Sequence, residues 1–195
     1  RLLVILDKNM HLLDHNRLDR IGIAEAILCE GKSNKQINNI CKELDDNIAT
    51  LLTRLRPNVF LELNKNVKKK ISYDSESNTG VYGKLPKLKR NIDVALISAG
   101  TSDLPFLLEA KWTLRCAGEN CVILSDLGVA GLWRIQKNLK IILKYKIIVA
   151  AAGMDGALVS VLGGLIPMPL IALPTSTGYG VSNKGNTALN SMLAS

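Results

Sequence analysis

Short apolar runs alternate with amphipathic stretches over the second half of this chain. Four runs have the length and aliphatic character of buried strands: 92–98, 120–125, 146–151 and 169–173. Four stretches that follow them have helical spacing, at about 102–117, 130–144, 155–166 and 179–194. Alternating strands and helices are typical of parallel βαβ units with helices on both faces of the sheet. We therefore predict a three-layer α/β fold with a Rossmann-like parallel sheet over residues 91–195.

The first 90 residues have a different pattern and predict a small helix-rich N-terminal domain, 1–90. Apolar positions recur at helical spacing over residues 1–56, and Asn34 is a candidate helix cap. Residues 48–55 fit either a strand or a further turn of helix. Residues 57–92 are rich in lysine and in turn residues, so we expect a basic connector there, with a short hairpin near Tyr73.

Composition supports a sizeable core and narrows the partner classes. The chain has 195 residues, of which 47% are hydrophobic and only 4% aromatic, so a mostly aliphatic core is expected. A net charge of +8 would suit a nucleic-acid partner. However, the lysines cluster in the polar middle, where Tyr73 and Tyr82 are the nearby rings for stacking on bases. We therefore predict a solvated basic segment and no nucleic-acid partner.

Residues 147–175 form a long apolar stretch in which Asp155 is the one charged residue. Glycines and prolines divide it into strand, loop, helix and second strand, so we expect no membrane span. The four cysteines have no CxxC spacing, and both histidines lie near the start, at His11 and His15. A structural zinc site is therefore not expected. Reduced thiols are the simplest account of the cysteines, which favours a cytoplasmic protein.

Each predicted strand of the second half ends in a loop that contains glycine. We call these four loops the loop rim: 99–103, 125–131, 152–156 and 174–180. In a parallel sheet, ligands bind outside the carboxyl ends of the strands, where all four loops would meet. Glycine lets a backbone approach a ligand closely, and helix N-termini hold phosphate. The loop rim therefore predicts a nucleotide site, although the GxGxxG and GxxxxGK[ST] fingerprints are absent.

The candidate catalytic residues are Asp103, Asp155 and Arg134. Asp103 is either a first-turn acid favoured by the helix dipole or a group that holds a substrate hydroxyl or a proton. Asp155 interrupts the most apolar part of the chain, where a carboxylate is costly unless it is paired or lies in a cleft. Arg134 fits a phosphate or carboxylate contact, or an ordinary surface position.

Further residues of the loop rim are predicted to bind substrate. Among them, Asp126 suits ribose or metal binding, or an Asx turn. The predicted substrate-binding residues are Gly100, Thr101, Ser102, Asp126, Gly131, Gly153, Met154, Gly156, Thr175, Ser176 and Tyr179. No Ser-His-Asp or Cys-His arrangement emerges from the sequence, so the residues alone identify no nucleophile.

The loop motifs, in this order, resemble those of the LarB family, the carboxylase/hydrolases of nickel-pincer nucleotide cofactor synthesis. The catalytic domain of that family is similar to the PurE carboxylase of purine synthesis. The motifs are Ala99-Gly-Thr-Ser-Asp103, Asp126-Leu-Gly-Val-Ala-Gly131 with Arg134, Ala152-Gly-Met-Asp-Gly-Ala157 and Pro174-Thr-Ser-Thr-Gly-Tyr-Gly180. The likeness continues into the first domain at Asp14, Arg17, Arg20, Gly22, Glu25, Gly31, Lys32, Gln36, Thr53 and Arg54. It is weakest over 57–90.

The resemblance implies a reaction and its partners. Family members carboxylate the pyridinium ring of nicotinic acid adenine dinucleotide and hydrolyse the phosphoanhydride, which releases AMP. Carbon dioxide is the co-substrate, and a divalent cation, expected to be magnesium, assists. A cysteine thiolate first adds to the ring, which turns an electron-poor pyridinium into an electron-rich dihydropyridine. The resemblance also implies a symmetric homo-oligomer.

The resemblance implies that this chain is a fragment. The family's cysteine follows a helix that matches residues 188–195, so we expect the chain to lack that nucleophile and the last strand, and not to run the full reaction. Two positions depart from the family pattern. Trp133 stands where the family has His, and Asp155 stands where it has Glu.

Two alternatives stay open. The first is an aminoimidazole ribonucleotide carboxylase or mutase of purine biosynthesis, which would need no cysteine. The first 90 residues and the loop 174–180 count against it. The second is a nucleotide-binding module without catalysis, which the departures at Trp133 and Asp155 favour.

Overall fold

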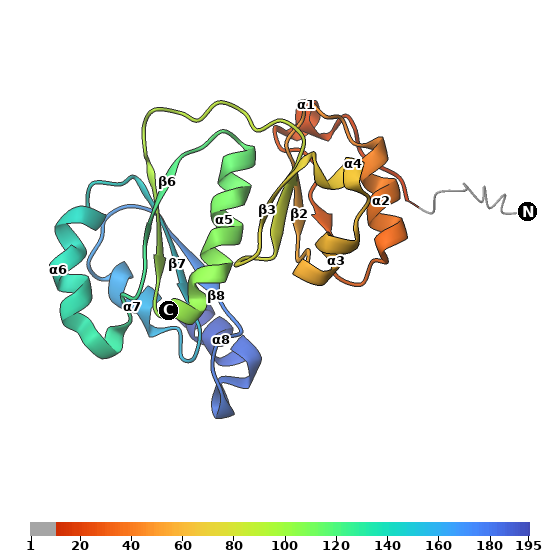
Figure 1. Cartoon of the computed structure of the whole chain (residues 1–195). Coiled ribbons are helices and arrows are strands. Elements are labelled where there is room, and N and C mark those ends of the chain that lie inside the picture. The colour runs from red at the N-terminus through yellow and green to blue at the C-terminus, as the bar shows by residue number, and fades with distance from the viewer. Residues whose placement is uncertain (1–10) are drawn as a thin grey trace, which may run out of the picture. The chain divides into compact units, whose positions relative to one another are not determined.

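The computed structural model describes residues 11–195 (Figure 1). The chain divides into two compact units, Arg1–Pro86 and Lys87–Ser195. Residues 1–10 of the predicted helical segment lie outside the described residues. None of the described helices is long and apolar enough to cross a membrane.

The described part of the N-terminal unit contains a mixed four-stranded sheet and short helices. In chain order its elements are α1 (Arg17–Ile21), β1 (Ile27–Leu28), α2 (Asn34–Glu43), β2 (Thr50–Thr53), α3 (Pro57–Glu62), α4 (Lys65–Lys68), β3 (Ile71–Asp74) and β4 (Thr79–Tyr82). The strand order is β1-β2-β4-β3. Strand β1 runs parallel to β2, and the other neighbours are antiparallel. Residues 48–55, which fitted strand or helix, thus contribute the strand β2.

Helix α2 shows why a predicted helix forms at this point. Ser33 is its N-cap: the Ser33 side chain accepts a hydrogen bond from the Gln36 N–H, and the Ser33 N–H donates to Gln36 Oε1 at 2.8 Å. This capping box satisfies two N–H groups that a helix start leaves open. The predicted cap, Asn34, is instead the first helical residue. Ile37 and Ile40 lie on the buried face of the helix.

Residues 57–82 correct the prediction of a basic connector over 57–92. They fold into α3, α4 and the hairpin β3–β4, which all belong to the N-terminal unit. Their lysines are mostly exposed, but Leu63, Val67 and Ile71 are buried in the core of this unit. The short hairpin predicted near Tyr73 is confirmed as β3–β4. The helices α3 and α4 were missed because neither has more than one buried residue, which leaves no periodicity for a sequence window to detect.

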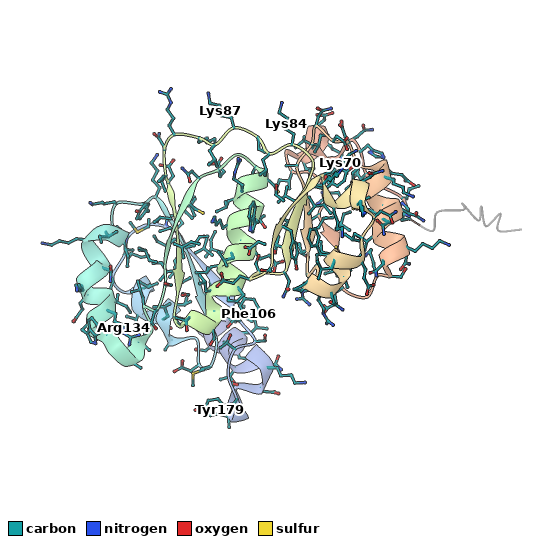
Figure 2. All side chains as sticks on the ribbon, in the orientation of Figure 1. Lys70, Lys84, Lys87, Phe106, Arg134 and Tyr179 are labelled. Carbon is teal, nitrogen blue, oxygen red and sulfur yellow. The ribbon has the colours of Figure 1, made fainter. Side chains whose placement is uncertain are left out.

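The segment between β4 and β5, residues 83–93, has no helix or strand. Lys84 and Lys87 project from it (Figure 2). Within the C-terminal unit, Lys89 forms an ion pair with Glu119. The predicted connector is therefore confined to this stretch.

The C-terminal unit is a parallel sheet with helices between its strands, as the sequence predicted. In chain order its elements are β5 (Val94–Ser98), η1 (Thr101–Asp103), α5 (Leu104–Cys116), β6 (Cys121–Leu124), η2 (Val129–Gly131), α6 (Leu132–Ile142), β7 (Ile147–Ala152), α7 (Ala157–Gly163), β8 (Leu170–Pro174), η3 (Gly180–Gly185) and α8 (Asn186–Ala194). The strand order is β6-β5-β7-β8, and all neighbours are parallel. The apolar stretch 147–175 is divided into β7, α7 and β8, as its glycines and prolines predicted.

Two apolar clusters cover the two faces of this sheet. On one face, Ala95 and Ile97 of β5 pack with residues of α6 and α7, including Ile135 and Leu158. On the other face, Leu96 of β5 packs with residues of α5. Alternate residues of one strand therefore enter opposite layers, which gives the predicted three-layer arrangement.

This arrangement places a topological switch point at the carboxyl ends of β5 and β7. The two strands are neighbours, yet the chain leaves β5 towards α5 on one face and leaves β7 towards α7 on the other. The loops after the two strands diverge for that reason. In open parallel sheets, such a switch point is where ligands bind.

Candidate functional site

The first loop of the rim is tied to the last by a buried carboxylate. Asp103 Oδ2 accepts a hydrogen bond from the Gly100 N–H at 3.0 Å, and Asp103 Oδ1 accepts one from Thr175 Oγ1 at 2.6 Å. The Asp103 residue is only 3% exposed and Thr175 only 2%. Thr177 Oγ1 adds a second link at 3.3 Å to the carbonyl oxygen of Ser102. Loops 99–103 and 174–180 are therefore held together.

The third loop packs directly on the last. The Met154 N–H donates to the carbonyl oxygen of Thr177 at 2.9 Å. A Cβ atom added to Gly153 would lie 2.2 Å from that same oxygen and 2.9 Å from Thr175 Oγ1. No side chain fits at position 153, so glycine is needed for the two backbones to meet.

The second loop packs on the first and carries an ion pair. The Asp126 N–H donates to Ser98 Oγ at 3.3 Å, and a Cβ atom on Gly128 would lie 2.8 Å from the carbonyl oxygen of Ala99. Asp126 Oδ1 lies 2.7 Å from Arg134 Nη1, so the two charges are paired. Arg134 extends from the first turn of α6 (Figure 2). Its guanidinium has five N–H donors, so donors remain for an anion.

Two loops of the rim hold non-glycine residues in the left-handed region. Asp126 has φ of +61° and Met154 has φ of +53°. Such conformations are uncommon outside glycine, although Asp tolerates them better than most residues, and they cluster at binding sites. Both residues lie where a strand has just ended.

Asp155 is placed differently from what its sequence context suggested. It is exposed, and its Oδ1 accepts a hydrogen bond from the Ala157 N–H at 3.3 Å at the start of α7. The cost of burying a carboxylate therefore does not apply to Asp155. The remaining reason to single out Asp155 is its position in the loop after β7, at the carboxyl edge of the parallel sheet.

The structure brings most of the predicted residues to one edge but not into one cluster. Hydrogen bonds and close backbone approaches link Gly100, Ser102, Asp103, Gly153, Met154 and Thr175 through the loops described above. Gly131 lies against Arg134, and Gly156 lies against α8. Thr101, Ser176 and Tyr179 are exposed on the loop rim, and Tyr179 projects into solvent (Figure 2). Their predicted roles, like those of the others, stay predictions.

Sequence reasoning missed two residues of this region. Thr177 bridges loops through its side chain and its carbonyl oxygen. Ser182 is 4% exposed, and its Oγ has no hydrogen-bond partner within residues 11–195. A Cβ atom on Gly178 would lie 2.7 Å from that oxygen. The run of small and hydroxyl residues at 174–182 was the available signal in the sequence. Only the folded loop shows that the Thr177 hydroxyl links two loops whereas the Ser182 hydroxyl has no partner within residues 11–195.

The thiols of the chain are not activated as nucleophiles. Burial raises the pKa of Cys29 to about 11, of Cys41 to about 12 and of Cys116 to about 11, and it also raises the pKa of Cys121. A reactive cysteine needs the opposite shift. All four cysteines are free, and none belongs to the loop rim.

The loop rim therefore offers groups that bind anions. The N–H groups at the start of η1 and the exposed hydroxyls of Thr101 and Ser102 are available to acceptor oxygens. Arg134 adds a positive charge that Asp126 only partly offsets. Within residues 11–195, no group of three or more His, Cys, Asp and Glu side chains is placed to hold a metal ion.

Comparisons with known proteins place both units in a family context. The family model for the LarB/PurE-like N-terminal domain matches residues 6–84. The uncharacterized protein MJ0165 of Methanocaldococcus jannaschii is 34% identical to this chain over 180 residues. That alignment covers 87% of this chain and 69% of the relative. The first match lies in the N-terminal unit, apart from the loop motifs of the C-terminal unit, so the two are separate grounds.

Proposed function

We propose that this chain, which belongs to the LarB family, provides the substrate site of a protein that carboxylates the pyridinium ring of nicotinic acid adenine dinucleotide and hydrolyses its phosphoanhydride to release AMP. The family supports a related carboxylase-type function, and the particular substrate is our assignment. The observation that carries it is the hydrogen bond between Asp103 and Thr175, which draws the first and last loops of the rim together beside the switch point.

In this proposal, one part of the rim holds the substrate phosphates. The N–H groups and hydroxyls of Thr101 and Ser102 bind phosphate oxygens at the start of η1. Arg134 binds them from the second loop, because a planar guanidinium can donate two hydrogen bonds to one phosphate. Asp126 orients Arg134 through their 2.7 Å contact.

The carboxylates have different roles in this proposal. Asp103 is a positioning residue, since both of its oxygens are already engaged by Gly100 and Thr175. Asp155 is exposed, and its Oδ2 accepts no hydrogen bond within residues 11–195, so it is the candidate for proton transfer. None of the four cysteines fits the thiolate step, because burial raises the pKa of each. The proposal therefore assigns no nucleophile among them.

A divalent cation, in this proposal magnesium, would arrive with the substrate. Magnesium is usually held by one or two carboxylates together with substrate phosphates, and it keeps several waters. The loop rim fits that pattern through Asp155, an exposed carboxylate in the loop after β7. The ion would neutralise charge on the pyrophosphate.

The test is a product assay with labelled bicarbonate. The protein is incubated with nicotinic acid adenine dinucleotide, magnesium and carbon-13 bicarbonate, and the products are analysed by mass spectrometry. We expect AMP together with a labelled pyridinium mononucleotide. If neither AMP nor label transfer is seen, the carboxylase/hydrolase assignment fails. AMP without label would reduce the proposal to a hydrolase.

Two controls separate the alternatives. Aminoimidazole ribonucleotide replaces the dinucleotide in a parallel assay, because a purine-type enzyme would carboxylate or isomerise that substrate instead. The match of the N-terminal unit to the LarB/PurE-like N-terminal domain favours the dinucleotide carboxylase/hydrolase over the purine-type enzyme. Binding of the dinucleotide without turnover of either substrate would identify a nucleotide-binding module.

We also propose that the protein self-associates. The C-terminal unit leaves large apolar side chains exposed, among them Ile171, Val181 and Leu193. These side chains lie on β8, η3 and α8, and exposed apolar side chains of this size are candidates for an interface between protein chains. Light scattering after gel filtration measures the mass, and a monomer at micromolar concentration would refute this part of the proposal.

A further inference from the structure

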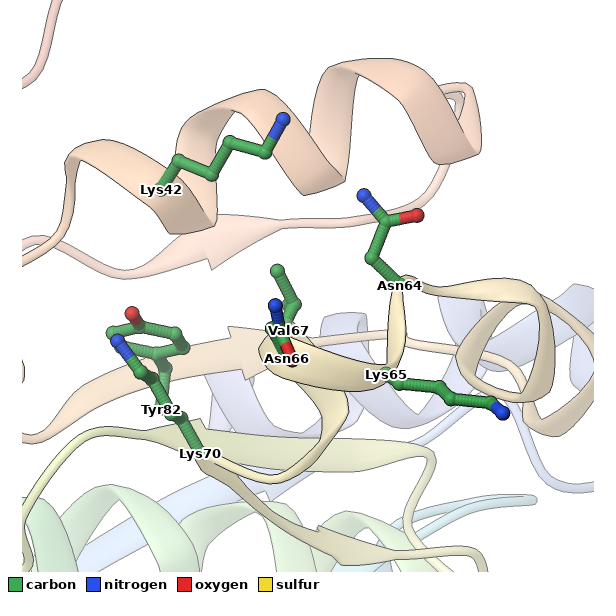
Figure 3. A pocket seen from close by; sticks show the side chains of 7 residues that line it. All are labelled: Lys42, Asn64, Lys65, Asn66, Val67, Lys70 and Tyr82. Carbon is green, nitrogen blue, oxygen red and sulfur yellow. The ribbon is translucent and has the colours of Figure 1, made fainter.

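A cavity of about 370 Å³ lies in the N-terminal unit, within the part of the chain that the structure describes. Three lysines, Lys42, Lys65 and Lys70, line it together with Asn64 and Asn66. Val67 and Tyr82 complete the lining. Lys42 and Asn64 extend towards the same space between α2 and α4, whereas the Lys65 side chain extends away from them (Figure 3). The size is within the range of small-molecule sites.

The charge on this cavity is only partly neutralised. Lys70 Nζ lies 2.6 Å from Asp46 Oδ2, and the Tyr82 hydroxyl donates to Asp46 Oδ1 at 2.7 Å. These contacts hold Lys70 in place. In contrast, Lys42 and Lys65 have no ion pair with any acidic side chain among residues 11–195. The cavity therefore keeps uncompensated positive charge.

The polar side chains that line the cavity are mainly hydrogen-bond donors. Lysine ammonium groups donate and never accept, and the side-chain amides of Asn64 and Asn66 add N–H donors. The backbone of Asn64 is fixed, because its N–H donates to Asn38 Oδ1 at 2.9 Å. A complementary ligand must be anionic and rich in acceptor oxygens. Phosphate has both properties.

Among residues 11–195, no exposed aromatic ring lines this cavity for a base to stack on. Tyr82 is 2% exposed, and Tyr73 of the same hairpin is stacked on Phe60 with ring centroids 4.1 Å apart. Single-stranded nucleic acids are bound through open aromatic faces as well as positive charge. The cavity therefore favours a small phosphorylated molecule over a nucleic-acid strand.

We propose that this cavity is a binding site for a small phosphorylated ligand, held through its phosphate by Lys42 and Asn64. The site belongs to the N-terminal unit and uses none of the loop-rim residues. It therefore does not depend on the function proposed for the loop rim.

The test is calorimetric titration of the protein with inorganic pyrophosphate, with and without added salt. We expect binding that weakens as salt rises, since exposed charges are screened. Lys42→Gln should weaken it about tenfold, the loss expected for one charge-assisted contact. Lys35→Gln, on the same helix α2 but outside the cavity, removes the same charge and should leave the affinity unchanged. Lys42→Arg should retain most of it.

A variant of the loop rim separates this site from the other. Arg134→Gln removes the cationic contact proposed for phosphate in the C-terminal unit, so pyrophosphate binding that is unchanged in this variant reports on the cavity. Absence of binding in this variant and in the unchanged protein would overturn the proposal. Equal losses in Lys42→Gln and Lys35→Gln would also overturn it, because they would show a diffuse charge effect. Displacement of pyrophosphate by a single-stranded oligonucleotide that binds more tightly would replace it with a nucleic-acid surface.

Discussion

The carboxylate of Asp103 and the hydroxyl of Thr175 are 2.6 Å apart, although 72 positions separate them in the sequence. Both residues are buried. A buried hydrogen bond to an ionised group is stronger than a neutral one, and leaving either partner unpaired is costly. This contact fixes the first and last loops of the rim relative to each other, so any function of the rim depends on it.

Substitution of Asp103 separates its structural role from a chemical one. Asp103→Ala leaves the Gly100 N–H and the Thr175 hydroxyl without a partner, and we expect a loss of about 2–4 kcal/mol in unfolding free energy. Asp103→Asn can accept from Gly100 with its oxygen and donate to Thr175 with its amide, so the loss should stay below about 1 kcal/mol. Urea denaturation measures both. If the two variants are equally stable, the hydrogen bonds described here do not hold the rim.

The same pair of variants bears on mechanism. A positioning role predicts that Asp103→Asn keeps part of the carboxylase rate, whereas a role in proton transfer predicts that the folded variant has lost it. The rate is measured as label transfer from bicarbonate. A fully active Asp103→Ala protein would remove Asp103 from the function of the rim altogether.

Two glycine substitutions of the same size should have opposite effects. Gly153→Ala places a methyl group 2.2 Å from the carbonyl oxygen of Thr177, so the third and fourth loops must separate. We expect a loss of about 2 kcal/mol or more, together with weaker substrate binding. Gly163→Ala meets nothing within 4 Å at the end of α7 and should be neutral or stabilise the protein by up to about 1 kcal/mol. Thermal unfolding compares the two, and similar melting temperatures would refute the close packing of the loops.

The sheet unit was predictable because its signals are local. Each strand from β5 to β8 is a short aliphatic run that ends at a glycine or a hydroxyl residue, and the βα alternation fixes which end of the sheet the loops share. The position of every one of these strands matches the predicted run to within a few residues. Hydrophobic spacing and chain order were sufficient for this part of the fold.

The rest depended on contacts between distant residues. Helix α3 has no buried residue and α4 has only Val67, so a sequence window cannot distinguish either helix from loop. Asp155 looked costly in an apolar stretch, but the turn before α7 exposes it. The bridging role of Thr177 arises only when the first and third loops both reach the last one.

The ion pair between Asp126 and Arg134 predicts that replacing each partner changes the KM in opposite directions. Arg134→Gln should raise the KM for the dinucleotide about tenfold, because a charged contact to phosphate is lost. Asp126→Asn should lower the KM by up to roughly fivefold, since a partly exposed ion pair that competes with phosphate contributes at most about 1 kcal/mol. Asparagine tolerates the left-handed backbone at this position, so the loop is retained. Initial-rate kinetics measure both values. A higher KM in Asp126→Asn would mean that Asp126 itself contributes to binding of the substrate.

The buried thiols predict a loss of stability at alkaline pH. Because the folded-state pKa of Cys41 is raised to about 12, the folded protein favours the neutral thiol. Its contribution is fully present below the ordinary value of 9.0 and is lost as pH rises from there towards 12. Cys41→Ala should therefore show a shallower decline in unfolding free energy above pH 9 than the unchanged protein. Parallel declines would contradict the burial of this thiol.

Thiol reactivity checks the same feature at neutral pH. In the folded protein, Cys29 and Cys41 should react slowly with iodoacetamide, since burial raises the pKa of both and hides them from the reagent. After denaturation all four cysteines should react at similar rates. Fast labelling of Cys41 in the native protein would refute this prediction.

Replacing Ser182 should raise the stability of the protein and weaken its binding of the dinucleotide. Its hydroxyl is buried without a partner among residues 11–195, so Ser182→Ala removes an unsatisfied group and should raise the unfolding free energy by about 1 kcal/mol. If the oxygen serves the loop rim, the same variant should bind the dinucleotide less tightly. Thr187 provides the control, because its hydroxyl in the same region donates to the carbonyl oxygen of Val181 at 2.5 Å, and Thr187→Val should only destabilise. Denaturation and fluorescence titration of the two variants give both quantities. A destabilised Ser182→Ala protein would show that this hydroxyl has a partner in solution, such as a buried water.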